Sequence, residues 1–509
     1  MSISRRGVMG QAAWMAGLAM VPAWGRQALA QMRFEAYPFS LGVASGDPAP
    51  DGMVLWTRLA PQPMDPAGGM PPQPFTLHWE IAEDAGFTRV AQRGEYVTRP
   101  ESAHSAHVEV AGLRPGRDYF YRFHAGTETS PTGRTRTTPA RGADVQQMRY
   151  AFTACQRYEN GFWSGYRQLV ADDPQVIFFL GDYIYELAAR DGLPRRHNPE
   201  ETTDLPSYRR RHALYKLDND LQAAHAAAPW MAIWDDHEVQ NNYGGDRPDK
   251  GGDRAAFLLR RAAAYQAYYE HMPLRRRAMP VGPSAEIYRA MDWGRLAQFQ
   301  LLDCRQYRSD PACTPKDAAG GNCEARHAQG HSMLGQRQEA WLMDQLSSSP
   351  AHWNVLAQQF MMAEARRPDP KTGELRFGLD GWDGYPAARD RIVGRWRDAR
   401  VSNPMAIGGD SHAFIASDLA VGDGPVVAPV FVGGSMSSTA GADFPAMVAA
   451  SPRVKFGESQ LRGYTIVDVD KHRCLVAMRN TVDATRPDTT VSTLKTFVVE
   501  DRVPGFRGA

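Results

Sequence analysis

Short stretches of alternating apolar and polar residues fill the first part of the chain, between about residues 37 and 138. Alternation with a period of two is typical of a half-buried strand, because successive side chains of a strand point to opposite faces. A turn that contains Gly and Pro, at residues 112–116, separates the last two of these stretches. Regular short strands of this kind predict an N-terminal antiparallel β-sandwich over residues 36–138. Its strands are expected at residues 54–58, 76–81, 106–110 and 119–123.

The pattern changes after a short linker at residues 137–142. The apolar runs that follow do not alternate, as expected for strands that are buried on both faces. Helical patterns lie between them, over residues 209–227 and 254–269. Strands that alternate with helices predict an α/β core with a mostly parallel sheet, over residues 146–509. The buried strands are expected at residues 148–154, 175–180, 230–234, 296–302, 354–357, 405–407 and 426–432.

Residues of the types that bind metals follow four of these buried strands. In open α/β sheets the chemistry takes place beyond the carboxyl ends of the strands. A single Asp at a strand end is usually a helix cap, but a group this large is costly to bury unless cations pair with it. Carboxylates, imidazoles and a thiolate are natural metal ligands, so the sequence predicts a metal centre. The strand ends read Ala154-Cys155-Gln156-Arg157, Gly181-Asp182-Tyr183-Ile184-Tyr185-Glu186, Trp234-Asp235-Asp236-His237-Glu238 and Gly408-Gly409-Asp410-Ser411-His412.

The N-terminus has the order of a secretory signal peptide, over residues 1–30. The pair Arg5-Arg6 precedes an apolar run at residues 12–23, and Ala28-Leu29-Ala30 supplies a cleavage pattern. The paired arginines indicate the twin-arginine route, whose translocation machinery is then a partner. A membrane anchor is the alternative, but the run is shorter than the ~20 residues needed to span a bilayer. We expect a periplasmic or secreted protein without a membrane anchor.

Charge and cysteine content narrow the class of protein further. The 58 basic and 57 acidic residues leave a formal net charge of +1. A standing nucleic-acid partner needs a clustered basic surface, so none is expected, and we expect a monomer. The odd number of cysteines leaves at least one thiol unpaired in an oxidising compartment. Cys313 and Cys323 flank a loop rich in Gly, Pro and Asp and are the best disulfide candidates. Cys155, at a strand end, is expected to take part in the chemistry of the site instead.

The strand-end motifs resemble those of a known group of enzymes. Their order is similar to that of calcineurin-like and purple-acid-phosphatase-like metallophosphoesterases. Residues 42–48, Gly-Val-Ala-Ser-Gly-Asp-Pro, resemble the N-terminal signature of the PhoD family of alkaline phosphatases and phosphodiesterases. The resemblance implies a metallophosphoesterase core, a sheet sandwich flanked by helices, behind an N-terminal domain that looks like a fibronectin type III module. Further blocks similar to that family follow in the same order at residues 181–186, 208–217, 234–242, 334–336 and 383–386.

The resemblance also implies a set of metal ligands. Asp182 matches a carboxylate that bridges two metals. The implied ligands of iron(III) are Cys155, Tyr185 and His412, and those of one or two calcium ions are Asp236, Asp410 and, as a weaker candidate, Asn241. Thiolate and phenolate suit Fe³⁺, and carboxylate oxygens suit Ca²⁺. Common metallophosphoesterases have Asp-x-His where this chain has Cys155-Gln156-Arg157, which argues against the alternative of a Mn²⁺ or Zn²⁺ pair.

Other polar residues near these motifs are candidates for substrate chemistry. His237 is interpreted as a ligand or as a proton donor to the leaving oxygen, oriented by Glu238, with a satisfied buried histidine as the alternative. Arg157 follows the ligand cysteine and can stabilise phosphate oxygens, which a guanidinium matches in geometry. Residues 195–197, Arg-Arg-His, either clamp the substrate or are solvated surface.

These features together predict hydrolysis of phosphate mono- or diesters by a metal-activated hydroxide, for phosphate acquisition outside the cytoplasm. A phospholipase-D-like enzyme or a phosphotriester hydrolase on the same scaffold is the alternative, because loops around the cleft choose the leaving group. An alternative from another class is a substrate-binding or adhesive surface protein with structural metals. A structural centre closes its coordination shell, whereas a catalytic centre keeps one position open.

Overall fold

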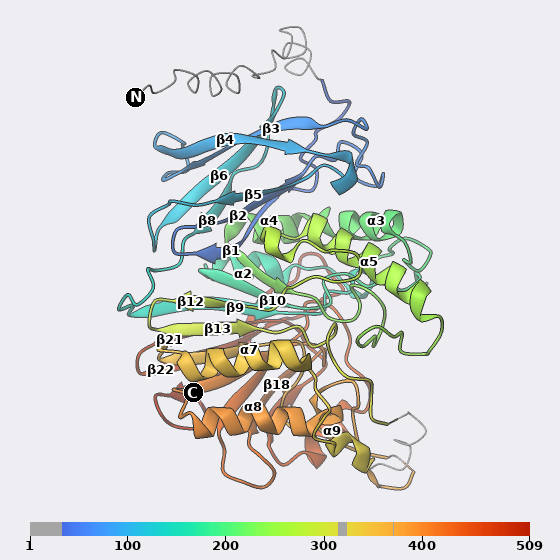
Figure 1. Cartoon of the computed structure of the whole chain (residues 1–509), viewed down its shortest axis with the longest axis vertical. Coiled ribbons are helices and arrows are strands. Elements are labelled where there is room, and N and C mark those ends of the chain that lie inside the picture. Colours follow the sequence, from blue (N-terminus) through green and yellow to red (C-terminus); the bar gives the residue numbers. More distant parts are fainter. Residues whose placement is uncertain (1–32, 314–322, 370) are drawn as a thin grey trace, which may run out of the picture.

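Two packed β-sheets form the centre of the molecule, and further layers lie on both sides of them (Figure 1). The computed structural model describes residues 33–313, 323–369 and 371–509, so the expected signal peptide lies outside the described residues. Within these ranges, no helix has both the length and the apolar character needed to cross a membrane.

The first central sheet has ten strands in the order β24-β23-β22-β21-β9-β10-β11-β1-β2-β5. Its middle strands β9, β10 and β11 are parallel, as the apolar runs without alternation predicted. The strands outside them, β21 to β24, are antiparallel to their neighbours and were not predicted. The bounds are β9 (Gln147–Thr153), β10 (Val176–Leu180), β11 (Trp230–Ile233), β21 (Arg462–Asp470), β22 (Arg473–Thr481), β23 (Val491–Glu500) and β24 (Arg507–Gly508).

The second central sheet has seven strands in the order β12-β13-β14-β17-β19-β18-β20, and β13, β14, β17 and β19 are parallel. The two sheets pack face to face through large apolar side chains. The ring of Phe299, in the second sheet, stacks on Phe178 of the first with centroids 4.5 Å apart. The bounds are β12 (Arg289–Trp293), β13 (Ala297–Leu301), β14 (Trp353–Ala357), β17 (Pro404–Gly408), β18 (Phe414–Leu419), β19 (Ala428–Gly433) and β20 (Val454–Glu458).

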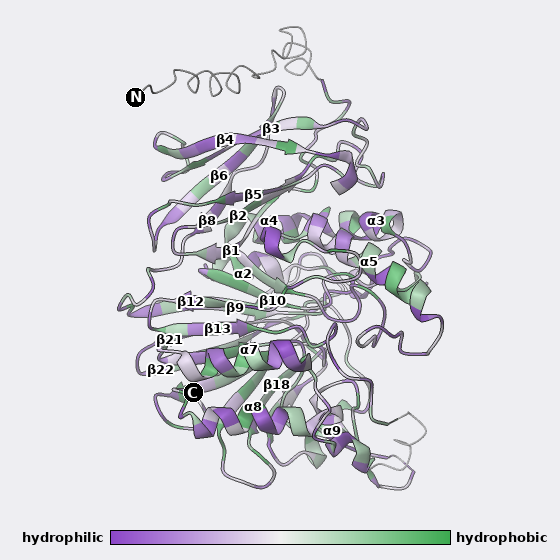
Figure 2. Ribbon diagram, in the orientation of Figure 1, coloured by the Kyte–Doolittle hydropathy of each residue, from purple (hydrophilic) through white to green (hydrophobic). Residues whose placement is uncertain are grey.

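Helices cover the outer faces of the two sheets. Hydrophilic and hydrophobic residues alternate along α7 and α8 (Figure 2), as expected for helices that cover a sheet with one face. The helix predicted over residues 209–227 is in fact two, because Asp218 caps a new N-terminus by accepting hydrogen bonds from the N–H groups of Asp220 and Leu221. The bounds are α2 (Gly165–Ala171), α3 (Leu205–Lys216), α4 (Asn219–Ala227), α5 (Arg254–His271), α7 (Gly335–Ser348), α8 (Pro386–Asp398) and α9 (Phe444–Ala450).

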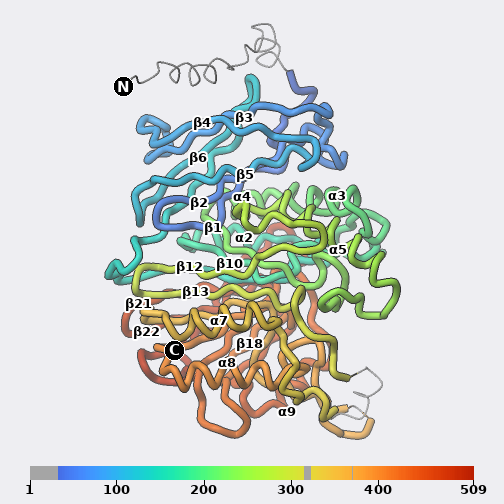
Figure 3. The backbone as a smooth tube through the Cα atoms, in the orientation of Figure 1, coloured from blue at the N-terminus to red at the C-terminus, as the bar shows by residue number. Residues whose placement is uncertain are grey.

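The N-terminal strands depart from the separate sandwich that the sequence predicted. A five-stranded sheet, order β4-β3-β6-β7 with β8 beside β6, packs on β1, β2 and β5, but these three strands belong to the first central sheet (Figure 3). The local alternation predicted each strand and could not show which sheet it joins. The bounds are β1 (Val43–Ala49), β2 (Gly52–Arg58), β3 (Phe75–Ala82), β4 (Val90–Thr98), β5 (Ser105–Val110), β6 (Asp118–Ala125), β7 (Glu128–Thr129) and β8 (Gly133–Arg136).

The junction between the N-terminal strands and the core explains part of the motif at residues 42–48. Gly46 pairs with Trp230 in the parallel contact between β1 and β11. A Cβ atom on Gly46 would lie 2.4 Å from the carbonyl oxygen of Pro273, so only glycine fits this approach. The next residue, Asp47, accepts a hydrogen bond of 2.6 Å from Nε of Arg289, and both side chains are buried. This part of the motif therefore fastens the N-terminal strands to the core.

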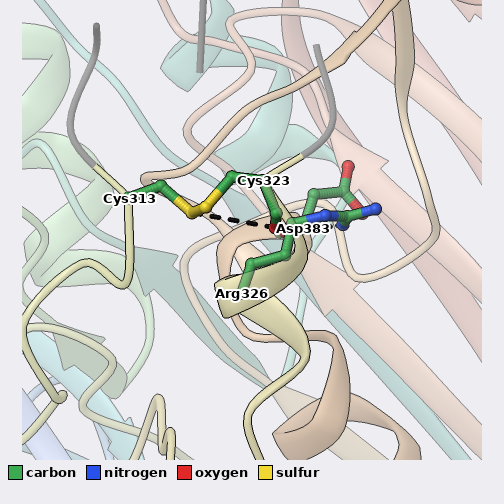
Figure 4. Close-up of a disulfide and its surroundings, with 4 residues drawn as sticks. All are labelled: Cys313, Cys323, Arg326 and Asp383. Carbon is green, nitrogen blue, oxygen red and sulfur yellow. Dashed lines mark hydrogen bonds between the residues drawn. A yellow bond between two sulfur atoms is a disulfide. The ribbon is translucent and has the colours of Figure 1, made fainter. Parts of the chain in front are cut away.

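The predicted pairing of Cys313 with Cys323 is confirmed. The two residues form a disulfide with their Cα atoms 6.2 Å apart (Figure 4). Beside it, Nη1 of Arg326 donates to the carbonyl oxygen of Asp383 at 2.8 Å. The remaining free cysteines, Cys155, Cys304 and Cys474, are buried.

Candidate metal centre

The candidate ligands lie beyond the carboxyl ends of β9, β10, β11 and β17, where the parallel strands of the two packed sheets end close together. Glycines make this approach possible. A Cβ on Gly181 would lie 2.4 Å from the Cβ of Asp235, and one on Gly409 would lie 2.5 Å from the Cβ of Ala154. Such short contacts would push the strand ends apart, so the glycine before each motif aspartate has a steric reason.

Several candidate ligands have a left-handed backbone conformation. This conformation costs a residue other than glycine about 1–3 kcal/mol and is concentrated at functional sites. The turn takes each side chain out of the strand direction, and the ligand atoms of these residues gather in close groups. The residues and their φ angles are Cys155 (57°), Asp182 (59°), Asp410 (55°) and His412 (53°).

Cys155, Asp182, Tyr185 and His412 form the first group. Ligand atoms of Cys155, Asp182 and His412 all lie within 4.8 Å of one another. The Tyr185 hydroxyl donates to Oδ2 of Asp182 at 2.7 Å and lies 3.0 Å from Nε2 of His412. The other ring nitrogen of His412 lies 2.9 Å from the carbonyl oxygen of Thr439, which leaves Nε2 directed at the group. The structure thus brings together the four side chains that the resemblance assigned to one metal.

Asp182 also belongs to a second group, with Asp236 and His237. Nδ1 of His237 lies 2.7 Å from Oε2 of Glu186, and its ring stacks on that of Tyr185 with centroids 4.1 Å apart. Nε2 of His237 lies 3.9 Å from Oδ2 of Asp236. Glu186 and Tyr185 therefore fix the His237 ring so that Nε2 faces the carboxylates.

The expectation that Glu238 orients His237 was wrong. The Glu238 carboxylate is fully buried and accepts backbone N–H groups from Asp182 at 3.2 Å, Tyr183 at 2.5 Å and Asp235 at 2.8 Å. It ties the ends of β10 and β11 together. Residues adjacent in sequence point in different directions here, and the partner of His237 is Glu186 on the neighbouring strand end.

A third group consists of Asp235, Asp236 and Asp410, and a fully buried arginine lies against it. Nε of Arg305 donates to Oδ1 of Asp235, and its Nη2 lies 3.3 Å from Oδ1 of Asp236 and 4.0 Å from Oδ1 of Asp410. Nη1 donates to Asp380 at 2.8 Å.

Sequence reasoning missed Arg305, although a signal was present. The run Asp303-Cys304-Arg305 directly follows Leu302, the last residue of a predicted buried strand, so charged residues follow this strand end as well. It also missed the part played by Asp235, whose side chain faces Arg305.

The electrostatics of the three groups favour a bound cation. Burial, and after it the neighbouring Asp182, raises the pKa of the Cys155 thiol and of the Tyr185 phenol well above their ordinary values. Burial raises the pKa of Asp410 to about 7, although Arg305 acts in the opposite direction. These donors cannot all ionise against one another, and a nearby cation reverses each of these shifts.

Two unpaired oxygen atoms at the site bear on whether a metal fits. Oδ1 of Asp182 and Oδ2 of Asp235 are buried without a hydrogen-bond partner among the described residues. Such atoms are rare in folded proteins because each one costs its full desolvation energy. A cation between the first two groups would pair with Oδ1 of Asp182, so the donor set fits a metal centre.

The remaining candidates lie at the edge of these groups. The Arg157 side chain is mostly buried, with its guanidinium 5.8 Å from the centre of the Tyr185 ring. Asn241 donates its backbone N–H to Oε1 of Glu186 at 2.7 Å, and the backbone N–H of Asn242 donates to Oδ2 of Asp236 at 2.7 Å. The assignment of the Asn241 side chain to a metal stays a prediction.

Residues 195–197 do not form the free substrate clamp that the sequence suggested. The Arg195 guanidinium lies 3.9 Å from the centre of the Tyr158 ring and forms an ion pair of 2.7 Å with Asp218. His197 is buried, and only Arg196 is solvated surface. Contacts within the protein thus already occupy the Arg195 guanidinium, and the His197 ring lies buried 3.1 Å from Glu159.

The sequence and the fold are those of a family of phosphatases. A family model described as "PhoD-like phosphatase" matches residues 150–478. A second one, "PhoD-like phosphatase, N-terminal domain", matches residues 25–139. The chain belongs to the PhoD-like phosphatase family and is a hydrolase.

Two relatives support this assignment over most of the chain. Alkaline phosphatase D of Bacillus subtilis (strain 168) is 43% identical over 488 residues, which cover 93% of this chain and 83% of the relative. A solved structure described as "Structure of PhoD" superposes with a TM-score of 0.88 at 42% identity, and the match covers 94% of this chain and 93% of that one.

Proposed function

We propose that the protein hydrolyses phosphate mono- and diesters at a centre that holds Fe³⁺ and one or two Ca²⁺ ions, and that it supplies phosphate outside the cytoplasm. One observation carries this proposal. Asp182 belongs both to the group with Cys155 and His412 and to the group with Asp236 and His237. A carboxylate that faces two sets of donors is suited to bridge two cations.

The chemistry of the two sides supports different ions. Thiolate, phenolate and imidazole from Cys155, Tyr185 and His412 suit Fe³⁺. Asp236 and Asp410, with Asn241 as the weaker ligand, suit the hard Ca²⁺ ion. When bound, such ions supply Lewis acidity, which lowers the pKa of water and neutralises phosphoryl oxygens.

Two residues of the chain, His237 and Arg157, would donate a proton and bind the phosphate oxygens. His237 is held by Glu186 through Nδ1, so Nε2 can donate a proton to the leaving oxygen. The guanidinium of Arg157 matches the geometry of phosphate oxygens. A buried, preorganised guanidinium stabilises the transition state most strongly where negative charge builds up during phosphoryl transfer.

The same proposal covers the fold and the domains. The two packed sheets with helices outside them support a metallophosphoesterase core over residues 146–509. Residues 36–138 are proposed as a domain similar to fibronectin type III that shares three strands with the core sheet.

Metal analysis of natively exported protein, together with a panel of phosphate mono-, di- and triesters, tests the function. Iron together with one or two calcium ions per chain, and turnover of mono- or diesters, support it. Preference for triesters or phospholipids favours the alternative hydrolases, because loops around the cleft select the leaving group. Metals without turnover of any ester contradict the proposal.

The identity of the first metal predicts a colour. Thiolate and phenolate donate electron density to Fe³⁺, so the protein should have a visible charge-transfer band. Cys155→Ser should bleach or shift the band and lower activity, and thiol reagents should not modify Cys155 while metal is bound. Absorption spectra and metal content measure both effects.

Cys474→Ser is the matched control, because Cys474 is a free, buried cysteine in β22. It should reduce stability slightly and leave the band unchanged. A colourless, active protein with two calcium, zinc or manganese ions would contradict the iron–thiolate assignment and leave the phosphoesterase proposal intact.

Export by the twin-arginine pathway predicts a second variant. Replacing both Arg5 and Arg6 with lysine should leave the precursor in the cytoplasm, because the receptor reads that pair. Cell fractionation measures it, with Arg26→Lys as the control in the same leader. If the doubly substituted protein still reaches the periplasm, a general secretory route accounts better for export.

A further inference from the structure

The Arg157 guanidinium is held on one side only. Its Nη2 donates to Oε2 of Glu159 at 2.6 Å, and its Nε lies 3.3 Å from the same oxygen. The backbone of Arg157 is also fixed, since its N–H donates to Oγ of Ser438 at 3.0 Å and its carbonyl oxygen accepts from Ser437 at 2.8 Å. Nη1 makes no hydrogen bond to a described residue, so one edge of the guanidinium stays available beside Tyr185.

Glu159 connects Arg157 to a distant part of the chain. Its side chain is fully buried. While Oε2 accepts from Arg157, Oε1 accepts the backbone N–H of Arg190 at 2.8 Å. Nε2 of His197 lies 3.1 Å from Oε2, and the His197 side chain is also fully buried. Burying a carboxylate is costly unless hydrogen-bond donors surround it. The Glu159 side chain is therefore held in one position by these contacts.

The segment that contains Glu159 packs against the segment that contains His197. Arg190 and His197 belong to the connection at residues 187–204, between β10 and α3. Arg195, from the same connection, lies over the rings of Tyr158 and Trp163 at 3.9 and 4.4 Å. The position of the Arg157 side chain therefore depends, through Glu159, on contacts with residues 187–204.

We propose that Glu159 and His197 are positioning residues for the reaction, which hold Arg157 so that its Nη1 edge meets the phosphoryl group beside Tyr185. The inference rests on the proposed function, because it takes Arg157 as the residue that binds phosphate. A guanidinium that is held before substrate arrives loses less freedom on binding, so the contact is stronger than one made by a mobile arginine.

A double-mutant cycle separates positioning from a structural role. The four proteins are the wild type, Glu159→Gln, Arg157→Met and the double variant, each with a metal analysis. We expect kcat/KM for a chromogenic phosphodiester to fall about 100-fold in Arg157→Met and about tenfold in Glu159→Gln, the range for residues that support an active centre. The double variant should equal Arg157→Met, because Glu159 acts only through Arg157.

His197→Asn provides a second variant if Glu159→Gln folds poorly. It should weaken inhibition by inorganic phosphate severalfold and leave the metal content unchanged. Arg196→Gln is the matched control, because Arg196 is the exposed neighbour of His197, and it should behave as the wild type.

If the double variant loses kcat/KM by the product of the two single losses, Glu159 acts independently of Arg157 and the positioning role is overturned. Loss of metal in Glu159→Gln overturns it too. Full activity of Arg157→Met removes Arg157 from the site and overturns the inference as well. If the wild type hydrolyses no phosphoester, the proposed function fails, and calorimetric binding of inorganic phosphate to the same four proteins still decides the positioning role.

Discussion

Asp182→Asn should lower kcat/KM for phosphoesters by about three orders of magnitude, which corresponds to about 4 kcal/mol of transition-state stabilisation. The amide keeps the size of the carboxylate and removes the charge that faces both donor groups. We expect metal content to fall on both sides of the centre, because one carboxylate serves both. Steady-state kinetics and elemental analysis on the purified variant measure these two losses.

The fold should survive this substitution. Asp182 lies at the meeting point of several acidic groups, so removing its charge relieves repulsion rather than creating it. Thermal unfolding should change little, and so should the far-UV circular dichroism of the β-rich chain. Asp191→Asn, at an exposed aspartate outside the site, is the control. Near-normal turnover by Asp182→Asn would remove this residue from the mechanism.

His412→Ala offers a comparison on one side of the centre. It removes a donor of the first group only, so iron should be lost in preference to calcium. Equal loss of both metals would mean that the two sides are not separately assembled.

The ends of the buried strands were predictable from the sequence because two local signals coincide there. Apolar runs without alternation marked β9, β10 and β11, and the residues directly after them carry the polar side chains. Parallel strands place such ends at one edge of a sheet, so residue type and position together located Asp182 and Asp236.

Contacts between distant segments were beyond this reasoning. The pairing of Gly46 with Trp230 joins the N-terminal strands to the core, and nothing in the alternation of either segment indicates it. The same limit applies to Glu186 and Glu238. Both follow a buried strand, and only the three-dimensional structure shows that Glu186 contacts His237 while Glu238 binds backbone N–H groups.

Arg305 shows that the number and type of charged residues in a sequence do not reveal which charges are buried at a site. An arginine is usually a surface residue, yet this one has no exposed side-chain area and forms ion pairs with Asp235 and Asp380. Its positive charge acts as a permanent counter-ion for part of the acidic cluster. The guanidinium also lies 3.3 Å from Asp236 and 4.0 Å from Asp410, so the proposed metals would share these two carboxylates with Arg305.

Arg305→Met should therefore destabilise the protein by about 3–5 kcal/mol, because it leaves the buried Asp235 without its partner. The Asp235 pKa is already raised by burial, and Arg305 is the group that opposes this shift. Activity should fall about 10–100-fold, as for other residues that support metal ligands. Chemical denaturation and steady-state kinetics measure the two effects.

The double variant Arg305→Met/Asp235→Asn decides whether the loss comes from an uncompensated charge. Removing both charged partners of a buried pair costs much less than removing one, so the double variant should recover most of the lost stability. Added calcium should also stabilise Arg305→Met more than the wild type, because the freed carboxylates attract a cation and binding to the folded state raises its stability. If the two substitutions add without recovery, and calcium stabilises both proteins equally, Arg305 is a packing residue and its charge has no part in the centre.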